Sequence, residues 1–330
     1  MIQKQSIIDI ISPATPCNSL QLDLIKNFLS SISLNFNIFY QAETTIKEDS
    51  IYGDSEFASC DVNYRFLQFK EALENPLSKI IWCSRGGYGS ADLLPMLHNI
   101  PKPKYPKILI GFSDITSLNI FFNQNWQMPV ISAPMLLQIA SKKISQSAID
   151  FLLNFLNDKI DELVFALRPV ISNDNGHNNK EKISGLLVGG CLSVLLSHCG
   201  TSNELDWHQK ILFLEDEGES GERLERYFNQ ILRIIIEKNR VPQAIIFGNF
   251  EESSIYGNVK SNNVELAIKI FANKIKQNNL DISLFIEPKK ILGHSPNSMP
   301  LILGWQAEIN NYLIKQKNLI FNINNKIFIE

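Results

Sequence analysis

The chain has 330 residues, of which 45% are hydrophobic and 20% are charged. At about 150 residues per domain, this length predicts two domains, and the composition excludes a disordered or collagen-like chain and a small disulfide scaffold. The 31 basic and 34 acidic side chains leave a formal net charge of −3. We therefore expect no nucleic-acid partner, because no basic surplus exists to neutralise a phosphate backbone.

Neither the cysteines nor the histidines form a recognisable metal or redox motif. The five cysteines are scattered without a C-x-x-C pair, and the five histidines show no H-E-x-x-H spacing, so we expect reduced thiols and no metal. The N-terminal apolar run is too short for a secretory signal, and the longest apolar stretch, Ile183–Leu196, is too short to span a bilayer. The default expectation is a cytoplasmic protein with no membrane partner.

The first half alternates short β-branched runs with amphipathic segments. Strands are expected over Ser6–Ile11, Asn37–Tyr40, Lys79–Cys83, Lys107–Phe112 and Val130–Ser132, and helices over Ser19–Ser31, Asp61–Glu74, Ser90–Leu97, Asp114–Asn123 and Ser145–Asn157. This alternation predicts an α/β domain with a mostly parallel sheet, in which sites form at the carboxyl ends of the strands.

A polar run, Arg168–Lys182, follows and is typical of a linker or exposed loop. We therefore predict domains at 1–167 and 183–330, separated by the linker 168–182. The second half is expected to contain strands at Lys210–Leu214 and Ala244–Phe247, helices at Glu222–Lys238 and Asn263–Lys276, and one or two strands within Leu319–Ile329.

The segment KILIGFSD, residues 107–114, delivers Ser113 to a predicted strand-to-helix turn. Such a turn exposes a serine hydroxyl over the sheet edge and brings the next amide, that of Asp114, close to a helix N-terminus, where it could stabilise an oxyanion. The alternative is that Ser113 or Asp114 merely caps the helix, which periodicity alone favours. The G-x-S-x-G pattern of a nucleophile elbow is also incomplete, because Ile115 occupies its last glycine position.

The glycine-rich turn SRGGYGS, residues 84–90, also follows a predicted strand. It lacks the G-K-[ST] ending of a phosphate-binding loop and the third glycine of a dinucleotide fingerprint. Its amides could line an oxyanion hole, or the glycines could simply permit a tight turn.

An acid and a histidine complete a possible triad. Glu215 is the first residue after the apolar run ILFL and could orient an imidazole, whereas the acids that follow it are expected in a loop and the first helical turns, where they favour the helix dipole. His294 lies in a predicted loop, GHSPNS, and a merely solvated histidine is the more common case there. Jointly, Ser113, Glu215 and His294 give the order Ser…Glu…His, each at the end of a predicted strand.

Blocks of the sequence, taken in order, resemble the LD-carboxypeptidases of the serine-peptidase type, a family that also contains the microcin C immunity peptidases. The blocks are ISPATP, DVNYRFLQFKEAL, IIWCSRGGYGSADLLP, ILIGFSDITSLN, GLLVGGCLSVLLSHCGT, ILFLEDEGE and GHSPNSMPLILG. The resemblance implies a Rossmann-like N-terminal domain and a C-terminal domain built around a small β-barrel, usually in a homodimer.

The same resemblance implies a cytoplasmic serine carboxypeptidase that uses no metal or cofactor. Ser113 matches the nucleophile, Glu215 the acid and His294 the histidine of the family, with an oxyanion hole from the amides of Gly87 and Asp114. Three positions depart from the pattern of many relatives: Cys191 in the GGCL block, Ser132-Ala133 before Pro134-Met135, and Glu222 in place of a tyrosine. These departures concern substrate contacts and leave the triad intact.

The function implied is release of the terminal D-alanine from peptidoglycan-derived tetrapeptides during cell-wall recycling. A carboxypeptidase must recognise a carboxylate, and Arg85 is the candidate donor, although a structural arginine is an equal alternative. An aminoacyl-nucleotide hydrolase of the microcin C type ranks second, because the segment 168–182 contains no Trp, Tyr or Phe to stack on adenine. A nonenzymatic ligand-binding module using the SRGGYGS turn is the alternative from a different class.

Overall fold

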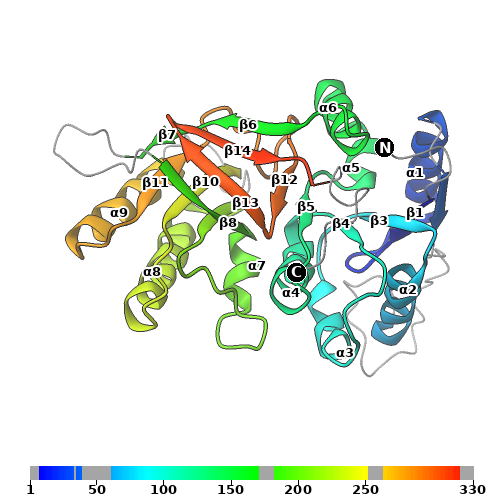
Figure 1. Cartoon of the computed structure of the whole chain (residues 1–330), viewed down its shortest axis with the longest axis horizontal. Coiled ribbons are helices and arrows are strands. Elements are labelled where there is room, and N and C mark those ends of the chain that lie inside the picture. Colours follow the sequence, from blue (N-terminus) through cyan, green and yellow to red (C-terminus); the bar gives the residue numbers. More distant parts are fainter. Residues whose placement is uncertain (1–6, 33–34, 39–60, 171–181, 252–262, 320–330) are drawn as a thin grey trace.

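The computed structural model describes residues 7–32, 35–38, 61–170, 182–251 and 263–319. Two sheets lie side by side along the long axis of the molecule, one formed mainly by the N-terminal half and the other mainly by the C-terminal half (Figure 1).

The first sheet has six strands in the order β12-β5-β4-β3-β1-β2. Five of them pair in parallel: β1 (Ile7–Ile11), β2 (Asn35–Ile38), β3 (Ser78–Cys83), β4 (Ile108–Ile110) and β5 (Val130–Ser132). The sixth, β12 (Leu301–Leu303), comes from the far end of the chain and pairs antiparallel with β5. The predicted parallel α/β domain is thus confirmed.

Helices follow these strands as the periodicity predicts. They are α1 (Ser19–Ser31), α2 (Val62–Glu74), a 3-10 turn (Ser90–Leu93) leading into α3 (Leu94–Leu97), a 3-10 turn (Ser113–Ile115) leading into α4 (Thr116–Asn125), α5 (Leu136–Ala140) and α6 (Gln146–Leu156). The start of α1 is fixed by a capping box, in which Asn18 and Gln21 exchange side-chain and backbone hydrogen bonds. Of these helices, α5 has no counterpart among the predicted elements.

The second sheet has eight strands in the order β6-β14-β13-β8-β9-β10-β11-β7. Their bounds are β6 (Glu162–Ala166), β7 (Arg168–Pro169), β8 (Lys182–Cys191), β9 (Ile211–Glu217), β10 (Ala244–Glu251), β11 (Ser283–Ile286), β13 (Trp305–Asn310) and β14 (Leu313–Lys317). The two edge strands, β6 and β7, are separated only by Leu167, so the sheet nearly closes on itself. This nearly closed sheet confirms the small barrel expected of the C-terminal half.

Three helices accompany the second sheet: α7 (Leu192–Ser197), α8 (Gly221–Glu237) and α9 (Asn263–Gln277). The amphipathic α8 buries Leu224, Phe228 and Ile231 against a cluster that also contains Phe271 of α9. No helix within the described residues is long and apolar enough to cross a membrane.

Each half of the chain contributes a strand to the other half's sheet. The strand β6 precedes the predicted boundary at residue 167 but belongs to the second sheet, and β12 lies within 183–330 but belongs to the first. The ends of the predicted linker form β7 and the start of β8, whereas residues 171–181 lie outside the described part of the chain, as do the strands expected beyond Leu319.

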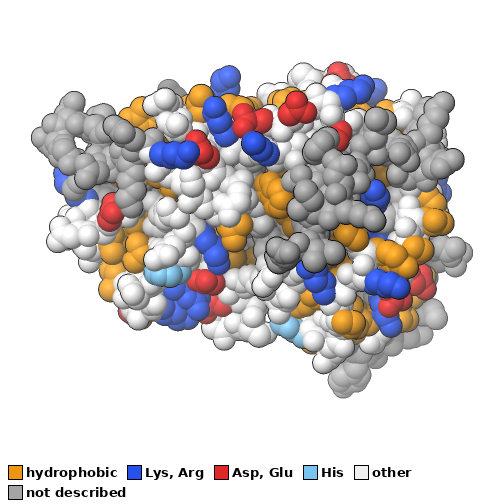
Figure 2. Space-filling model, viewed as in Figure 1, with side chains coloured by type: hydrophobic (Ala, Val, Ile, Leu, Met, Phe, Trp, Pro, Cys, Tyr) orange, Lys and Arg blue, Asp and Glu red, His pale blue; other side chains and the backbone are white. Residues whose placement is uncertain are grey.

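The surface carries charges of both signs. In the view of Figure 2, Lys and Arg side chains lie beside Asp and Glu side chains, and the described residues on this face form no uniform basic band. This mixture agrees with the small net charge of the sequence.

Candidate active site

Ser113 lies on a sharp turn between β4 and α4. Its backbone φ of 62° falls in the left-handed region, which non-glycine residues rarely adopt. The turn is tight on its inner side, because a Cβ at Gly111 would lie only 3.0 Å from Ile115 Cγ2. The side chain of Asn119 donates to the carbonyl of Gly111 at 3.1 Å and supports the turn from the helix. This geometry is that of a strained elbow rather than of a plain helix cap.

The glycine-rich turn after β3 packs directly on this elbow. A Cβ at Gly86 would lie 3.2 Å from Ser113 Cβ and 3.3 Å from Ser113 Oγ. The next residue, Gly87, has a φ of 111°, and a side chain there would overlap Thr15. The hydroxyl of Thr15 in turn accepts a hydrogen bond from the amide of Tyr88 at 3.0 Å. The loop that contains Thr15 therefore holds the glycine turn beside Ser113.

Asp114 connects the elbow to the glycine turn from behind. Its carboxylate accepts from the amide of Ser90 at 2.9 Å, and its backbone carbonyl accepts from Ser90 Oγ at 2.6 Å. Burial raises the pKa of the Asp114 carboxyl, opposed by the hydrogen bonds from Ser90. The amide of Asp114 belongs to the first turn of the 3-10 helix Ser113–Ile115, where backbone N–H groups lack intrahelical acceptors.

Glu215 and His294 form a buried pair in the second half of the chain. Glu215 Oε2 accepts from His294 Nδ1 at 2.6 Å and from the His294 amide at 3.1 Å. Both side chains are almost fully buried, so the solvated-histidine alternative does not hold for His294. Gly293 permits this approach, because a Cβ there would lie 2.7 Å from the Glu215 side chain. Asn249 of β10 fixes the same loop by donating its side-chain amide to the carbonyl of His294.

Three carboxylates determine the charge state of His294. Burial alone would lower the pKa of His294, but the attraction and hydrogen bond of Glu215, together with Glu217 and Asp216, outweigh it and raise the pKa to about 9. The imidazole is therefore protonated at neutral pH in this state, with its Nδ1–H directed at Glu215. Phe112 packs against the ring at a centroid distance of 4.5 Å and limits its rotation.

The residues after Glu215 continue the strand, contrary to the expectation of a loop there. Because β9 extends to Glu217, successive side chains alternate between its faces. Asp216 is buried and accepts from the amide of Ser193 at 2.7 Å, whereas Glu217 returns to the face of Glu215 and places Oε2 3.5 Å from His294 Nε2. The E-x-E spacing was the sequence signal that could have identified Glu217.

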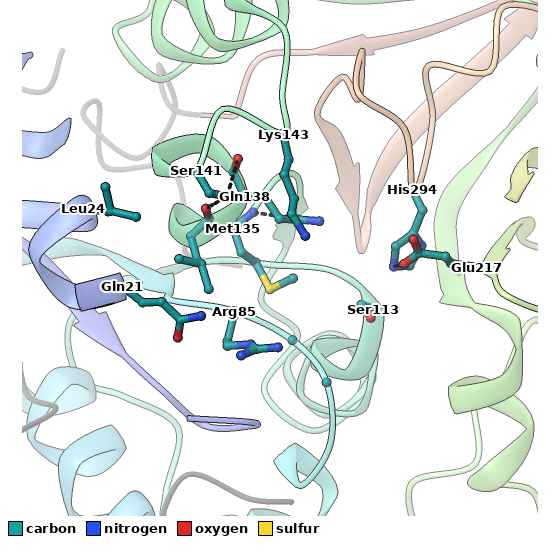
Figure 3. Close-up of a pocket in the computed structure, with 13 residues that line it drawn as sticks. Gln21, Leu24, Arg85, Ser113, Met135, Gln138, Ser141, Lys143, Glu217 and His294 are labelled. Carbon is teal, nitrogen blue, oxygen red and sulfur yellow. Dashed lines mark hydrogen bonds and ion pairs between the residues drawn. The ribbon is translucent and has the colours of Figure 1, made fainter. Parts of the chain in front are cut away.

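One pocket of about 440 Å³ joins the two halves of the site (Figure 3). Of the predicted site residues, Arg85, Gly87, Ser113 and His294 line it, with Glu215 directly behind His294. Further lining residues that the sequence did not single out include Gln21, Leu24, Gln138, Ser141, Lys143 and Glu217. In Figure 3, Ser113, His294 and Glu217 lie on one side of the pocket and Gln21 and Leu24 on the other.

Two cationic side chains face this pocket. Arg85 is half-buried and donates from one guanidinium nitrogen to the carbonyl of Pro16 at 3.2 Å, which fixes its direction. Lys143 is exposed and follows α5, the helix that the sequence did not predict. The pocket is thus lined by two cationic side chains as well as by Glu217 at the acidic end of β9.

The departures noted in the sequence lie in different places. Cys191 is buried at the end of β8, in register with Glu215, and burial, followed by the charges of Glu215 and Asp216, raises the pKa of its thiol well above the usual range. Ser132 and Ala133 are buried at the end of β5, whereas Glu222 lies on the exposed first turn of α8, where the helix-dipole interpretation placed it. Within the described residues, no group of three or more His, Cys, Asp or Glu side chains has the arrangement of a metal site.

Family models match both halves of the chain. The LD-carboxypeptidase N-terminal domain matches residues 8–133, and the LD-carboxypeptidase C-terminal domain matches residues 184–309. The chain belongs to the LD-carboxypeptidase family. The resemblance inferred from the sequence blocks is thereby confirmed, and so is the expectation of a serine-type carboxypeptidase, a peptide hydrolase.

Curated relatives agree with this assignment. A putative carboxypeptidase of Rickettsia conorii is 27% identical over 93% of this chain and 88% of its own length. The murein tetrapeptide carboxypeptidase of Pseudomonas aeruginosa is 31% identical over 58% of this chain and 62% of its own length. A probable murein peptide carboxypeptidase of Bacillus subtilis is 26% identical over 70% of this chain and 68% of its own length.

Solved structures share the fold at low identity. The muramoyltetrapeptide carboxypeptidase from Oxalobacter formigenes has a TM-score of 0.69 at 23% identity, covering 94% of this chain and 97% of that one. The microcin C7 self-immunity protein has a TM-score of 0.71 at 18% identity, covering 95% and 96%. These two likenesses show the common architecture.

Proposed function

We propose that this LD-carboxypeptidase releases the terminal D-alanine from peptidoglycan-derived tetrapeptides by means of a triad of Ser113, Glu215 and His294. The observation that carries the proposal is that one pocket is lined by a serine on a left-handed elbow and by a histidine whose Nδ1 lies 2.6 Å from a buried glutamate. The murein peptidase names of relatives support the substrate class.

The first half of the reaction forms an acyl-enzyme. The reaction requires neutral His294, whose imidazolium has first lost the Nε2 proton to solvent. Nε2 then takes the proton of Ser113 Oγ, and Oγ attacks the carbonyl carbon of the bond between the L-centre and D-alanine. The amides of Gly87 and Asp114 stabilise the oxyanion. The C–N bond then breaks, and the proton on Nε2 passes to the amine of the departing D-alanine.

The second half returns the enzyme to its starting state. His294 removes a proton from water, the resulting hydroxide attacks the ester carbonyl, and the proton returns to Ser113 Oγ as the shortened peptide leaves. Glu215 holds the Nδ1–H throughout and stabilises the imidazolium. Every proton is carried by these side chains, so the steps require no cofactor.

Recognition of the substrate's terminal carboxylate is assigned to the cationic side of the pocket. Arg85 is the principal candidate, because its guanidinium faces the pocket while Pro16 holds one of its nitrogens in place. A planar guanidinium matches a carboxylate with two parallel hydrogen bonds. This contact would favour a free C-terminus over an internal peptide bond.

We also propose a cytoplasmic location, a role in murein recycling and a homodimeric state. These three proposals rest on the family resemblance, and size-exclusion chromatography with light scattering tests the oligomeric one. Family membership argues against the nonenzymatic binding module.

The decisive experiment is mass spectrometry of defined muropeptides after incubation with the purified protein. The wild type should release D-alanine from the tetrapeptide, and Ser113→Ala should reduce the rate by about 10⁴-fold or more while retaining the fold. Ser147→Ala, an exposed serine on α6, is the matched control. Absence of D-alanine release by folded wild type would contradict the proposal, and hydrolysis of an aminoacyl sulfamoyl adenosine instead would favour the microcin-type alternative.

A further inference from the structure

The imidazole of His294 is held between two carboxylates of the same strand. Residues two apart on a strand share a face, so Glu215 and Glu217 both point at the ring from β9. Glu215 Oε2 lies 2.6 Å from His294 Nδ1, and Glu217 Oε2 lies 3.5 Å from His294 Nε2. The two contacts differ in solvent access, because the Glu215 side chain is fully buried and that of Glu217 is 58% exposed.

The Nε2 contact matters because this nitrogen is the proposed base for Ser113. An imidazole whose Nδ1–H is bound to Glu215 can accept the serine proton only at Nε2. A carboxylate beside Nε2 favours a proton there and so favours the imidazolium. The resting arrangement therefore stabilises the form of His294 that cannot act as a base.

We propose that Glu217 is a positioning residue that pairs with the Nε2 side of His294 and sets the pH at which His294 becomes the base for Ser113. The inference rests on the proposed function, since it assumes that His294 deprotonates Ser113. Glu217 acts through His294 and makes no bond in the reaction itself.

The other charged groups near His294 do not fill this role. Glu215 and Asp216 on β9 are buried, with Glu215 bound at Nδ1 and Asp216 bound to the Ser193 amide. Among the described residues, the other titratable or charged groups around the site are Asp114 behind the elbow, the buried thiol of Cys191, and Arg85 and Lys143 at the pocket. Among the carboxylates named, Glu217 is the exposed one, so solvent, salt or a bound substrate can separate it from the imidazole. The raised pKa of His294, about 9, agrees with a second carboxylate on the ring.

The test is the pH profile of kcat/KM for D-alanine release between about pH 6 and 10. The acid limb is the part of this profile in which kcat/KM rises with pH as His294 loses its proton. Glu217→Gln should move this limb to lower pH by about half a pH unit. At pH 7, kcat/KM should therefore rise by about threefold, because a larger fraction of His294 is neutral. Glu217→Asp keeps the charge, and its limb should lie between those of the wild type and Glu217→Gln. Glu237→Gln, which removes an exposed charge from the far end of the following helix α8, is the matched control and should leave the pH profile unchanged.

Ionic strength provides a second arm. The Glu217 contact is exposed, so salt should weaken it. Raising NaCl from about 0.05 to 0.5 M should therefore move the acid limb of the wild type to lower pH, and this salt-dependent shift should be smaller in Glu217→Gln. An NMR titration of the His294 ring, assigned with His294→Gln, measures the same pKa without reference to activity.

The outcomes separate the inference from the proposed function. If Ser113→Ala retains activity, the triad itself is wrong. If Ser113→Ala is inactive but Glu217→Gln changes neither the acid limb nor the NMR titration of His294, the positioning role is overturned. The positioning role would also be overturned if Glu217→Gln raised KM at every pH and left the acid limb at the wild-type pH, because that result assigns Glu217 to a substrate contact.

Discussion

Gly87 combines an unusual backbone conformation with a close neighbour. Its φ is 111°, and a Cβ at this position would overlap the hydroxyl of Thr15. We therefore predict that Gly87→Ala displaces the glycine turn from Ser113 and lowers kcat by about 10²-fold or more, the usual effect of losing one oxyanion donor. Steady-state kinetics with a tetrapeptide substrate measures this.

Gly200→Ala provides the control for Gly87→Ala. Gly200 also has a positive φ, 84°, but nothing lies within 4 Å of the position of its Cβ. Both variants should lose about 1 kcal/mol of stability from backbone strain, and only Gly87→Ala should lose activity. Equal kinetics in the two variants would remove Gly87 from the oxyanion hole.

The pKa of His294 also makes stability depend on pH. Because the folded-state pKa is raised from 6.5 to about 9, protonated His294 stabilises the fold fully below about pH 6.5, and this contribution is lost as the pH rises through about 9. The difference of about 2.5 pKa units corresponds to about 3 kcal/mol. Urea unfolding should show that the wild type has a larger free energy of unfolding than His294→Gln at pH 6 and loses most of this difference at pH 9.5. A difference in the free energy of unfolding that does not change with pH would disprove the contribution of His294 protonation.

At the scale of elements, α2 fixes the glycine turn through one buried side chain. Arg65 donates from Nη1 to the carbonyls of Pro13 at 2.8 Å and Gly89 at 2.6 Å, and from Nη2 to Asp92 at 3.0 Å. It thus connects the loop that carries Thr15 to the turn that carries Gly87. The nearly complete burial of Arg65 means that removing it leaves several acceptors unpaired.

We predict that Arg65→Met lowers both the melting temperature and kcat, the latter by about tenfold or more, because the turn beside Ser113 loses its anchor. Lys70→Met on the same helix removes a partly exposed charge that pairs with Glu74 at 3.8 Å, and it should change neither quantity. Differential scanning fluorimetry and steady-state kinetics measure the two effects. A stable, fully active Arg65→Met enzyme would disprove the anchoring role.

The strands and helices of the site were predictable from local patterns, but their precise ends were not. Periodicity predicted β4 and α4 on either side of Ser113, but a helix cap accounts equally well for a serine at this position of the sequence. Only the positive φ of Ser113 in the structure distinguishes an elbow from a cap. The strand β9 was expected to end at Leu214 because acids are typical of loops. It continues to Glu217 because the acids have partners: Glu215 and Glu217 at His294, and Asp216 at Ser193. Such partners come from distant segments and leave no local signal.

At the scale of the whole molecule, the two sheets are joined by exchanged strands and a continuous core. The strand β12 pairs with β5 across about 170 residues of sequence, a contact that local periodicity cannot predict. Gln316 of β14 then hydrogen-bonds both the N–H and the carbonyl of Ile302 on β12, at 3.0 and 2.7 Å. One hydrophobic cluster contains Ile110 of the first sheet and Phe213 of the second. The elements that hold Ser113 and those that hold His294 thus depend on the same contacts.

We therefore predict that both halves unfold as one cooperative unit. Ile302 is fully buried, and Ile302→Ala should lower the free energy of unfolding by about 2 to 4 kcal/mol. Hydrogen exchange measured by mass spectrometry should report this loss equally in peptides that cover β4 and β9, whereas Val164→Ala, at an exposed position on β6, should change neither by much. A loss confined to the first sheet would mean that the halves unfold separately, and the triad could then break apart while each half of the chain stayed folded.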